Sequence, residues 1–136
     1  MKQYGIVPAA WAPYLLSALR IVAAFGYMSH GTMKLFAFPS SGPDAHPVAL
    51  LSLFGAGGII ETFGGGLILL GLCTRPVAWL CAGEMAVAYF LFHAPNGFWP
   101  VLNHGEIVVA YCFLFLYLAA AGPGPISLDA KLGKSA

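Results

Sequence analysis

The chain has 136 residues, of which 60% are hydrophobic and 8% are charged, whereas roughly a quarter of an ordinary soluble domain is charged. This composition indicates an integral membrane protein, and the length accommodates one domain, residues 1–136. The formal net charge of +1, without a basic block or an acidic tail, argues against nucleic acid as a partner. The expected partners are therefore the lipid bilayer, a small molecule and other membrane proteins.

Four apolar runs predict transmembrane helices, because each is near the ~20 residues that cross ~30 Å of hydrocarbon. They cover residues 14–36, 48–72, 76–92 and 106–121. The last two are short and would need a locally thinned bilayer. Since lipid offers no partner to a free backbone amide, we expect an all-α membrane protein, a bundle of four transmembrane helices. Residues 122–136 form a short cytoplasmic tail in this interpretation.

The basic residues set the predicted orientation. One side of the four-span arrangement carries Lys2, Arg75, Lys131 and Lys134. By the positive-inside rule both termini are cytoplasmic, and the loop at 93–105 faces the periplasm or the exterior. The first run has no clear cleavage site, so we interpret it as a retained anchor and not as a signal peptide.

Two helix starts carry capping signals. Thr74 is the expected N-cap of the third helix. Asn103, with Glu106 three positions later, predicts an N-cap and a carboxylate that satisfies free amides at the start of the fourth helix. Alternatively, Glu106 belongs to an outer polar cluster with His93 and His104, which flank the same loop.

Glycines concentrate around Glu61 in the second run. Gly57 and Gly65 lie four residues to either side of it, and Gly58 and Gly64 lie three. Small residues at these intervals allow membrane helices to approach closely. We therefore expect the Glu61 side chain to point at a packed helix neighbour and not at lipid.

Two carboxylates, Glu61 and Glu84, are predicted near the middle of their spans, about 16–20 Å and about 12 Å from the nearer ends. A charge at that depth costs several kcal/mol, so such residues usually mark a site or a proton path. The alternative is a protonated or hydrogen-bonded group that only holds helices together. Arg20 is expected either to extend to the cytoplasmic interface or to turn inward toward the two carboxylates.

His30 and Lys34 share a helix face near the outer end of the first run, because they are four residues apart. Lys34 alone is interpreted as an anchor whose ammonium reaches the interface. His30 can relay a proton, bond a quinone carbonyl, ligate a metal or bridge two helices.

Support for a metal or haem site is thin. His30, His93, His104 and Glu106 are acceptable ligand types, but no H-x-x-x-H or H-E-x-x-H motif places two of them on one helical face. Axial haem ligation by two of these histidines rests on the same grounds. We therefore predict no metal ligands, while haem and metal stay open as unfavoured alternatives.

Several stretches together resemble the DoxX family of small four-helix membrane proteins. They are LRIVAAFGYMSHGTMKLF in the first run, GIIETFGGGLILLGLCTRPVAW across the second run and the following turn, MAVAYF, and NHGE before the fourth run. The resemblance extends from Leu19 to Asp129 and implies a protein grouped with oxidoreductases. The founding members are small subunits of an archaeal thiosulfate:quinone oxidoreductase, and mycobacterial relatives are linked to a complex that handles thiols and oxidative stress. No agreed catalytic residues carry over, and similar four-helix proteins act as cargo receptors and assembly chaperones.

The resulting hypothesis is a redox-associated subunit of the bacterial inner membrane that binds a quinone, or a similar hydrophobic redox molecule, between its helices. The predicted catalytic, proton-handling residues are His30, Glu61, Glu84 and Glu106. The predicted binding residues are Arg20, Lys34, Tyr27, Phe63, Tyr89, His93, Trp99 and His104. Electrons would come from a redox partner protein. The sequence is equally compatible with a homo-oligomer as with a complex with such a partner. The alternatives are a non-enzymatic membrane scaffold or assembly factor, and a small transporter or proton conductor.

Overall fold

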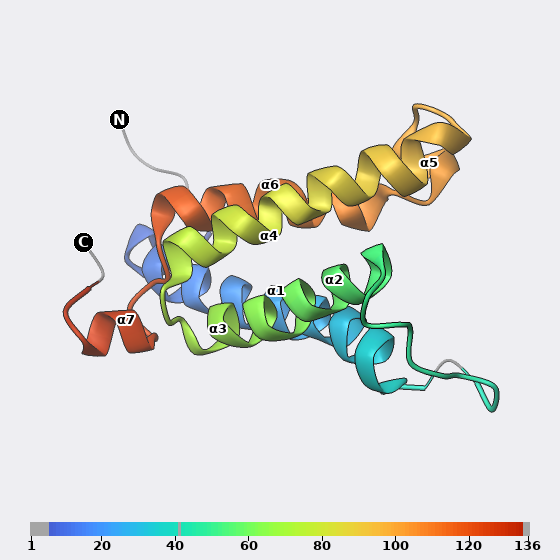
Figure 1. Ribbon diagram of the computed structural model, residues 1–136. Coiled ribbons are helices and arrows are strands. Elements are labelled where there is room, and N and C mark those ends of the chain that lie inside the picture. The colour runs from blue at the N-terminus through green and yellow to red at the C-terminus, as the bar shows by residue number, and fades with distance from the viewer. Residues whose placement is uncertain (1–5, 41, 135–136) are drawn as a thin grey trace.

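The computed structural model describes residues 6–40 and 42–134, which form helices and connecting loops without a strand (Figure 1). Three helical stretches are long and apolar enough to cross a membrane: Ala9–Phe36, Leu53–Leu70 and Thr74–Asn96. A further apolar helix, Glu106–Ala121, is shorter. The all-helical prediction is thus confirmed for the described residues, whereas the fourth span and the cytoplasmic placement of both termini stay predictions.

The first stretch consists of η1 (Ala9–Trp11) and α1 (Ala12–Phe36). The second consists of α2 (Leu53–Ile59), the π turn η2 (Ile60–Gly64) and α3 (Gly65–Leu70). The third consists of α4 (Thr74–Ala88), the π turn η3 (Tyr89–His93) and the 3-10 turn η4 (Ala94–Asn96). The short α5 (Pro100–Asn103), α6 (Glu106–Ala121) and the short α7 (Leu128–Lys131) complete the chain.

The third helical stretch is longer than the run at 76–92 predicted from the sequence. The chain stays helical through η3 and continues into η4, where Pro95 occupies the first turn. Proline is tolerated in the first turn of a helix, and the change from the π turn to the 3-10 turn places Pro95 at such a position. The extension gives this stretch 23 residues, so it no longer depends on a thinned bilayer.

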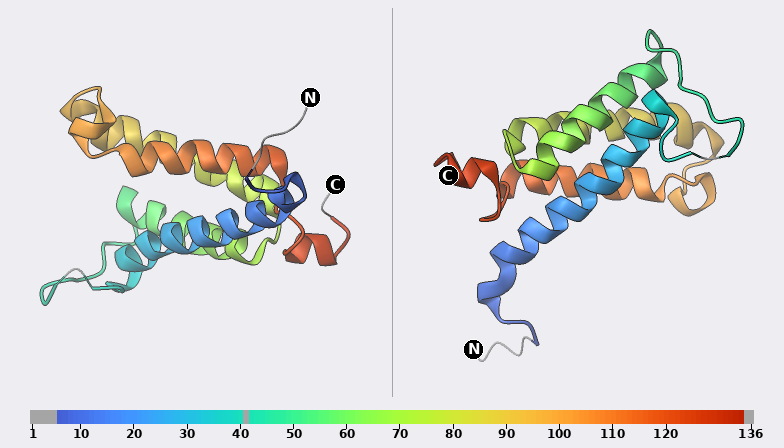
Figure 2. Two further views of the ribbon diagram at one scale, coloured as in Figure 1. Left: turned by 180° about the vertical axis from the view of Figure 1, so that it is seen from behind. Right: turned by 90° about the horizontal axis from the view of Figure 1, so that it is seen from below.

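The helices pack as two pairs (Figures 1 and 2). In one pair α1 lies along α2, η2 and α3, and in the other α4 lies along α6. The pairs meet near the end where α7 lies and diverge toward the end that carries α5. The buried core consists of Ala24, Tyr27, Ile68, Ala78, Cys81, Ala82, Met85, Phe115 and Leu118.

Glycine allows the close approach of α1 and the second helical stretch. A Cβ atom at Gly31 would lie 2.8 Å from the carbonyl carbon of Glu61, and one at Gly65 would lie 3.0 Å from Cα of Met28. Both distances are too short for a real side chain, so the two backbones are in contact at these points. The glycine packing expected around Glu61 is therefore observed, and it fixes η2 against α1.

Arg20 does not turn inward toward Glu61 and Glu84. Its side chain is 1% exposed and donates hydrogen bonds to the backbone carbonyls of Ile68 and Leu69, at the end of α3, and to those of Pro123 and Ile126. The last carbonyls of a helix have no partner within it, which explains why a five-donor guanidinium is stable there. Arg20 thus ties the end of α3 to the chain that follows α6.

The start of α4 is capped by a residue from the far end of the sequence. The carboxylate of Asp129 accepts hydrogen bonds from the backbone N–H groups of Cys73 and Thr74, both 2.9 Å long. The prediction of Thr74 as the N-cap was therefore wrong, since Thr74 is the first residue of α4. Asp129 is buried, so this part of the tail belongs to the packed structure.

Candidate functional site

A cavity of about 320 Å³ lies between the two helix pairs, toward the end where they diverge. Six residues that the sequence indicated as candidates line it: Tyr27, His30, Lys34, Glu61, Glu84 and His93. The rest of its wall consists of Leu53, Phe54, Gly57, Met85, Ala88, Phe92, Ile107, Val108 and Tyr111. The cavity is therefore mainly apolar and aromatic, with a few polar groups that converge on it, which is the usual composition of a small-molecule site.

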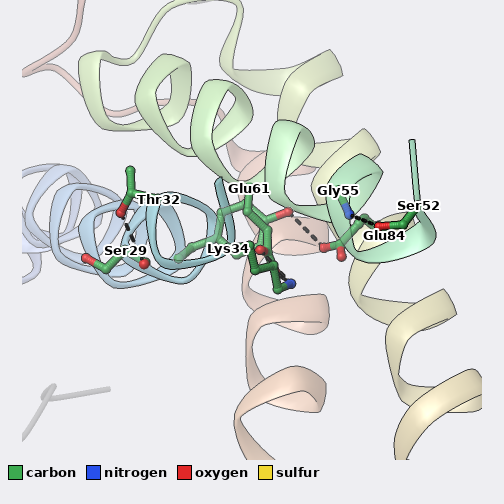
Figure 3. Close-up of polar contacts among 8 residues, drawn as sticks. Ser29, Thr32, Lys34, Ser52, Gly55, Glu61 and Glu84 are labelled. Atoms are coloured by element: carbon green, nitrogen blue, oxygen red, sulfur yellow. Dashed lines mark hydrogen bonds and ion pairs between the residues drawn. The ribbon is translucent and has the colours of Figure 1, made fainter. Parts of the chain in front are cut away.

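Lys34 and Glu61 form an ion pair across the first helix pair. Lys34 Nζ donates to Glu61 Oε1 at 2.8 Å and lies 2.7 Å from Oε2, and the two side chains face each other in Figure 3. The interpretation of Lys34 as an interfacial anchor was wrong, because its ammonium is directed at this carboxylate. Glu61 is 3% exposed, so the pair is held in a medium where removing either charge is costly.

Glu61 belongs to the π turn η2, which interrupts the regular helix between α2 and α3. Single π turns inside α-helices occur frequently at functional sites. Glu61 Oε2 accepts no hydrogen bond with suitable geometry, although Lys34 Nζ compensates its charge. This oxygen therefore keeps the capacity to accept a proton or a hydrogen bond from another donor.

The hydroxyl group of Tyr27 in α1 donates a 3.0 Å hydrogen bond to Glu84 Oε2 in α4. Tyr27 is 1% exposed, and its ring packs edge-on against Phe115 with the centroids 4.7 Å apart. Its position is therefore fixed by packing on α6 as well as by the hydrogen bond. One polar contact thus links the two helix pairs at the wall of the cavity.

Gly57 lies beside both the Glu84 carboxylate and the Lys34 ammonium. A Cβ atom at Gly57 would lie 3.4 Å from Glu84 Oε1 and 3.7 Å from Lys34 Nζ. The missing side chain leaves α2 open at this point, and the Glu84 carboxylate and the Lys34 ammonium approach it from different helices. Four ionisable or hydroxyl groups, those of Tyr27, Lys34, Glu61 and Glu84, therefore form one cluster.

Two histidines lie at the wide end of the cavity. The ring of His30 packs edge-on against Tyr111 at a centroid distance of 6.5 Å. His93 Nδ1 is 3.0 Å from the carbonyl oxygen of Asn103, so this nitrogen carries the proton and donates it. In the neutral ring the other nitrogen of His93 is then an acceptor. Sequence reasoning missed Tyr111, because nothing near it in the apolar fourth run distinguishes it from a lipid-facing tyrosine.

Tyr89 and Asn103 brace the loop between η3 and α6. Tyr89 donates to the carbonyl oxygen of Phe98 at 2.6 Å, and Asn103 Nδ2 donates to the Tyr89 hydroxyl at 3.3 Å and to the Gly97 carbonyl at 2.7 Å. Asn103 Oδ1 accepts from the backbone of Gly105, which is itself the N-cap residue of α6. The prediction of Asn103 as the N-cap of this helix was therefore wrong.

The structure does not bring every candidate residue to the cavity. Those that do not line it are Arg20, Phe63, Tyr89, Trp99, His104 and Glu106. Phe63 is 64% exposed and Trp99 is 63% exposed, so both present their rings to the surroundings of the bundle. Within 6–40 and 42–134, no three His, Cys, Asp or Glu side chains gather closely enough to hold a metal ion.

Comparisons with known proteins identify relatives over most of the chain. The DoxX family profile matches residues 15–94. An uncharacterized protein of Haemophilus influenzae is 40% identical over 132 residues, which cover 91% of this chain and 95% of that protein. Inner membrane protein YqjF of Escherichia coli is 39% identical over 85 residues, 56% of this chain and 59% of its own. An uncharacterized membrane protein of Mycobacterium tuberculosis is 28% identical over 142 residues, 93% of this chain and 86% of its own. No solved structure matches the chain.

Proposed function

The chain belongs to the DoxX family of integral membrane proteins, and from this premise we propose that it is a redox-associated subunit that binds a quinone or a similar hydrophobic redox molecule. The observation that carries the proposal is the cavity between the two helix pairs. Its walls are apolar and aromatic, and its one polar cluster joins Tyr27, Lys34, Glu61 and Glu84.

The size and walls of the cavity suit one substituted ring. Its volume of about 320 Å³ lies at the lower end of the ~300–1,000 Å³ that is typical of ligand sites. Phe54 and Phe92 are stacked with their centroids 4.8 Å apart, and Tyr111 lies on the α6 side. Aromatic rings at these positions stack on a flat ligand. The imidazole of His30 and the ammonium of Lys34 supply donors for carbonyl oxygens of the ligand.

Proton transfer is the part of the chemistry assigned to this chain. Reduction of a quinone to a quinol consumes two electrons and two protons. The proposal assigns the electrons to a redox partner protein and the protons to the pairs Tyr27–Glu84 and Lys34–Glu61. A carboxyl group in apolar surroundings can hold a proton near neutral pH and release it when a neighbouring charge changes.

The membrane arrangement that accompanies this function has four spans, with α6 as the fourth and both termini in the cytoplasm. It is supported by Arg75, in the first turn of α4, and by Lys131 and Lys134 in the tail, all at the end of the bundle where α7 packs. The name of the Escherichia coli relative places that protein in the inner membrane, and we propose the bacterial inner membrane for this chain too. The cavity then opens toward the periplasmic half.

Binding is tested with protein in lipid nanodiscs, titrated with a tailless benzoquinone and followed by calorimetry. Ala88→Phe places a ring in the cavity and should weaken binding more than tenfold. Ala110→Phe adds the same bulk on the exposed side of α6, away from the cavity, and should leave binding unchanged. Equal affinity of the Ala88→Phe variant and the unmodified protein would refute the site.

Proton handling is tested in membrane vesicles that contain the native electron donor, by quinone-dependent turnover. Glu61→Gln and Glu84→Gln should each lower turnover at least tenfold, because the amide cannot exchange a proton. Asp44→Asn, in the exposed loop between α1 and α2, is the matched control. Full turnover in both glutamine variants would refute the proton-handling role of Glu61 and Glu84. The proposal that the cavity binds a quinone would then remain.

A small proton conductor is a second candidate, favoured by the approach of Lys34 and Glu84 to Gly57 from different helices. The two functions differ in their requirement for a ligand. Proton flux into liposomes that contain the purified protein and no quinone, abolished by Glu84→Gln, would favour the conductor.

A further inference from the structure

A groove of about 430 Å³ lies beside the cavity, between α2 with η2 on one side and α4 on the other. Its outer rim is formed by Trp79, Leu80 and Val87, which are 68%, 55% and 52% exposed. The groove follows α4 and η3 from Trp79 to Phe92, a length of about 20 Å at ~1.5 Å per residue. Because α4 belongs to a candidate membrane span, this rim faces hydrocarbon and not water.

The groove and the cavity share one wall. Both are lined by Leu53, Gly57, Glu84, Ala88 and Phe92. Among the described residues that line the groove, Glu84 is the one with an ionisable side chain, and it lies where the groove meets the polar cluster. The groove and the cavity therefore form one continuous path. Its lining is apolar at the bilayer end and becomes polar where it meets the cluster of Tyr27, Lys34, Glu61 and Glu84.

Two glycines keep this path open. Gly57 lies in the shared wall, and a side chain there would contact both Glu84 and Lys34. Gly83 lines the groove, and a Cβ atom at Gly83 would have no other group within 4 Å. Glycine lowers helix stability relative to alanine, and no close packing in the described structure requires it at this position. A larger residue at Gly83 would extend into the free volume of the groove.

From these features we infer that the groove holds the apolar tail of the ligand whose polar head lies in the cavity, and that this ligand enters sideways from the bilayer between α2 and α4. This inference rests on the proposed function. It identifies the ligand class as a single-chain amphiphile, with a compact uncharged head and an isoprenoid or alkyl tail. The cavity, at about 320 Å³, accommodates the head, and the adjoining 430 Å³ accommodates part of the tail.

Charge distinguishes this occupant from an ordinary membrane phospholipid. A phosphate head placed at the inner end of the groove would face the carboxylates of Glu84 and Glu61, with the Lys34 ammonium already paired to Glu61. Two acids and one base repel an anion, whereas an uncharged head with carbonyl oxygens carries no such penalty.

The test compares a tailless benzoquinone with a decyl benzoquinone in nanodiscs, each affinity corrected for partition into empty nanodiscs. The unmodified protein should bind the decyl compound at least tenfold more tightly. Gly83→Leu should abolish that preference and change the affinity for the tailless ring less than twofold. Ala110→Leu, which introduces the same side chain on the exposed side of α6, should keep the preference. Helix propensity favours leucine over glycine, so Gly83→Leu is expected to fold.

The position of the tail is read out independently with a decyl benzoquinone that carries a photoreactive group in its chain. Cross-links should map to residues 79–87 and disappear in the Gly83→Leu variant. Equal affinity for both compounds, cross-links elsewhere, or equal labelling of residues 79–87 by a photoreactive phospholipid would overturn the tail site. Binding of the tailless ring in those cases would leave the proposed function standing, whereas loss of all quinone binding would overturn both.

Discussion

The hydroxyl group of Tyr27 and the carboxylate of Glu84, 57 positions apart in the sequence, form the hydrogen bond that joins the two helix pairs. The bond spans α1 and α4, which belong to different pairs. It lies at the wall of the cavity, so the same contact holds the pairs in register and presents an acid group to a bound molecule. A proton transfer between Glu84 and a bound ligand would therefore also change the strength of the hydrogen bond that holds the two helix pairs together.

Tyr27→Phe should destabilise the protein by about 1 kcal/mol, a typical contribution of a hydrogen bond between membrane helices. The ring and its packing on Phe115 remain, so the loss measures the hydroxyl group alone. The measurement is thermal unfolding in detergent, followed by circular dichroism. Tyr117→Phe, on an exposed part of α6, is the control. An unfolding temperature equal to that of the control would show that the Tyr27–Glu84 bond contributes nothing to stability.

Lys34→Met should destabilise the protein by about 3 kcal/mol, because it leaves the Glu61 carboxylate buried without its counter-charge. Glu61→Gln combined with Lys34→Met should recover most of this loss, since neither remaining group is charged. Thermal unfolding of the two single variants and the double variant gives the coupling free energy directly. Strictly additive losses would contradict the ion pair as the reason for the effect.

Gly31→Ala should destabilise the protein by about 1–3 kcal/mol, the usual cost of overpacking. The added methyl group would meet the backbone of η2 at the Glu61 carbonyl carbon, and backbone cannot move aside as a flexible side chain can. Gly66→Ala is the matched control, because its nearest neighbour, Met28 Sδ, would be 3.8 Å away. Gly66→Ala should be neutral or slightly stabilising through helix propensity. Equal unfolding temperatures for the two variants would contradict the close contact of α1 with η2.

Asp129 predicts a specific pH dependence of stability. Burial alone would raise its pKa, but the backbone N–H groups of Thr74 and Cys73 bond the charged form and together hold the pKa below its usual value. A carboxylate with a lowered pKa in the folded state stabilises the fold at pH values above its unfolded pKa, about 3.9. This contribution is constant from neutral pH down to about 5 and is lost as the pH falls through the folded pKa.

The measurement compares the thermal stability of the unmodified protein and of Asp129→Asn between pH 7 and pH 3. The difference between the two should be largest at pH 7 and should shrink below about pH 4. Asp44→Asn, which removes an exposed carboxylate, is the control. A difference that stays constant over the whole range would show that the charge of Asp129 has no part in capping α4.

Local sequence features predicted the helices well, because hydrophobic runs and punctuation by glycine and proline are local signals. The runs at 14–36 and 106–121 nearly coincide with α1 and α6. The glycines around Glu61 likewise predicted close packing, because a small residue allows a close approach whichever helix packs against it. The π turns were not predicted, because they depend on how the backbone adjusts to its neighbours and not on residue type.

Partners distant in the sequence could not be predicted in the same way. Lys34 and Glu61 are 27 positions apart, Thr74 and Asp129 are 55 apart, and Arg20 and Pro123 are 103 apart. A buried charge in a membrane span indicates that a partner exists without indicating which residue it is. Depth arguments therefore singled out Glu61 and Glu84, both of which line the cavity, but they did not identify Glu61 as the partner of Lys34.

The contacts of Arg20 and Asp129 have a consequence for the order of assembly during synthesis. The start of α4 meets its capping residue Asp129, and Arg20 completes its contacts with Pro123 and Ile126, only when the residues that follow α6 have been synthesised. Until then the turn between α3 and α4 has polar backbone groups that only water can satisfy, so it must stay at the membrane surface. The helical hairpin can therefore enter the bilayer early, but the turn between α3 and α4 is completed only after α7 has been synthesised.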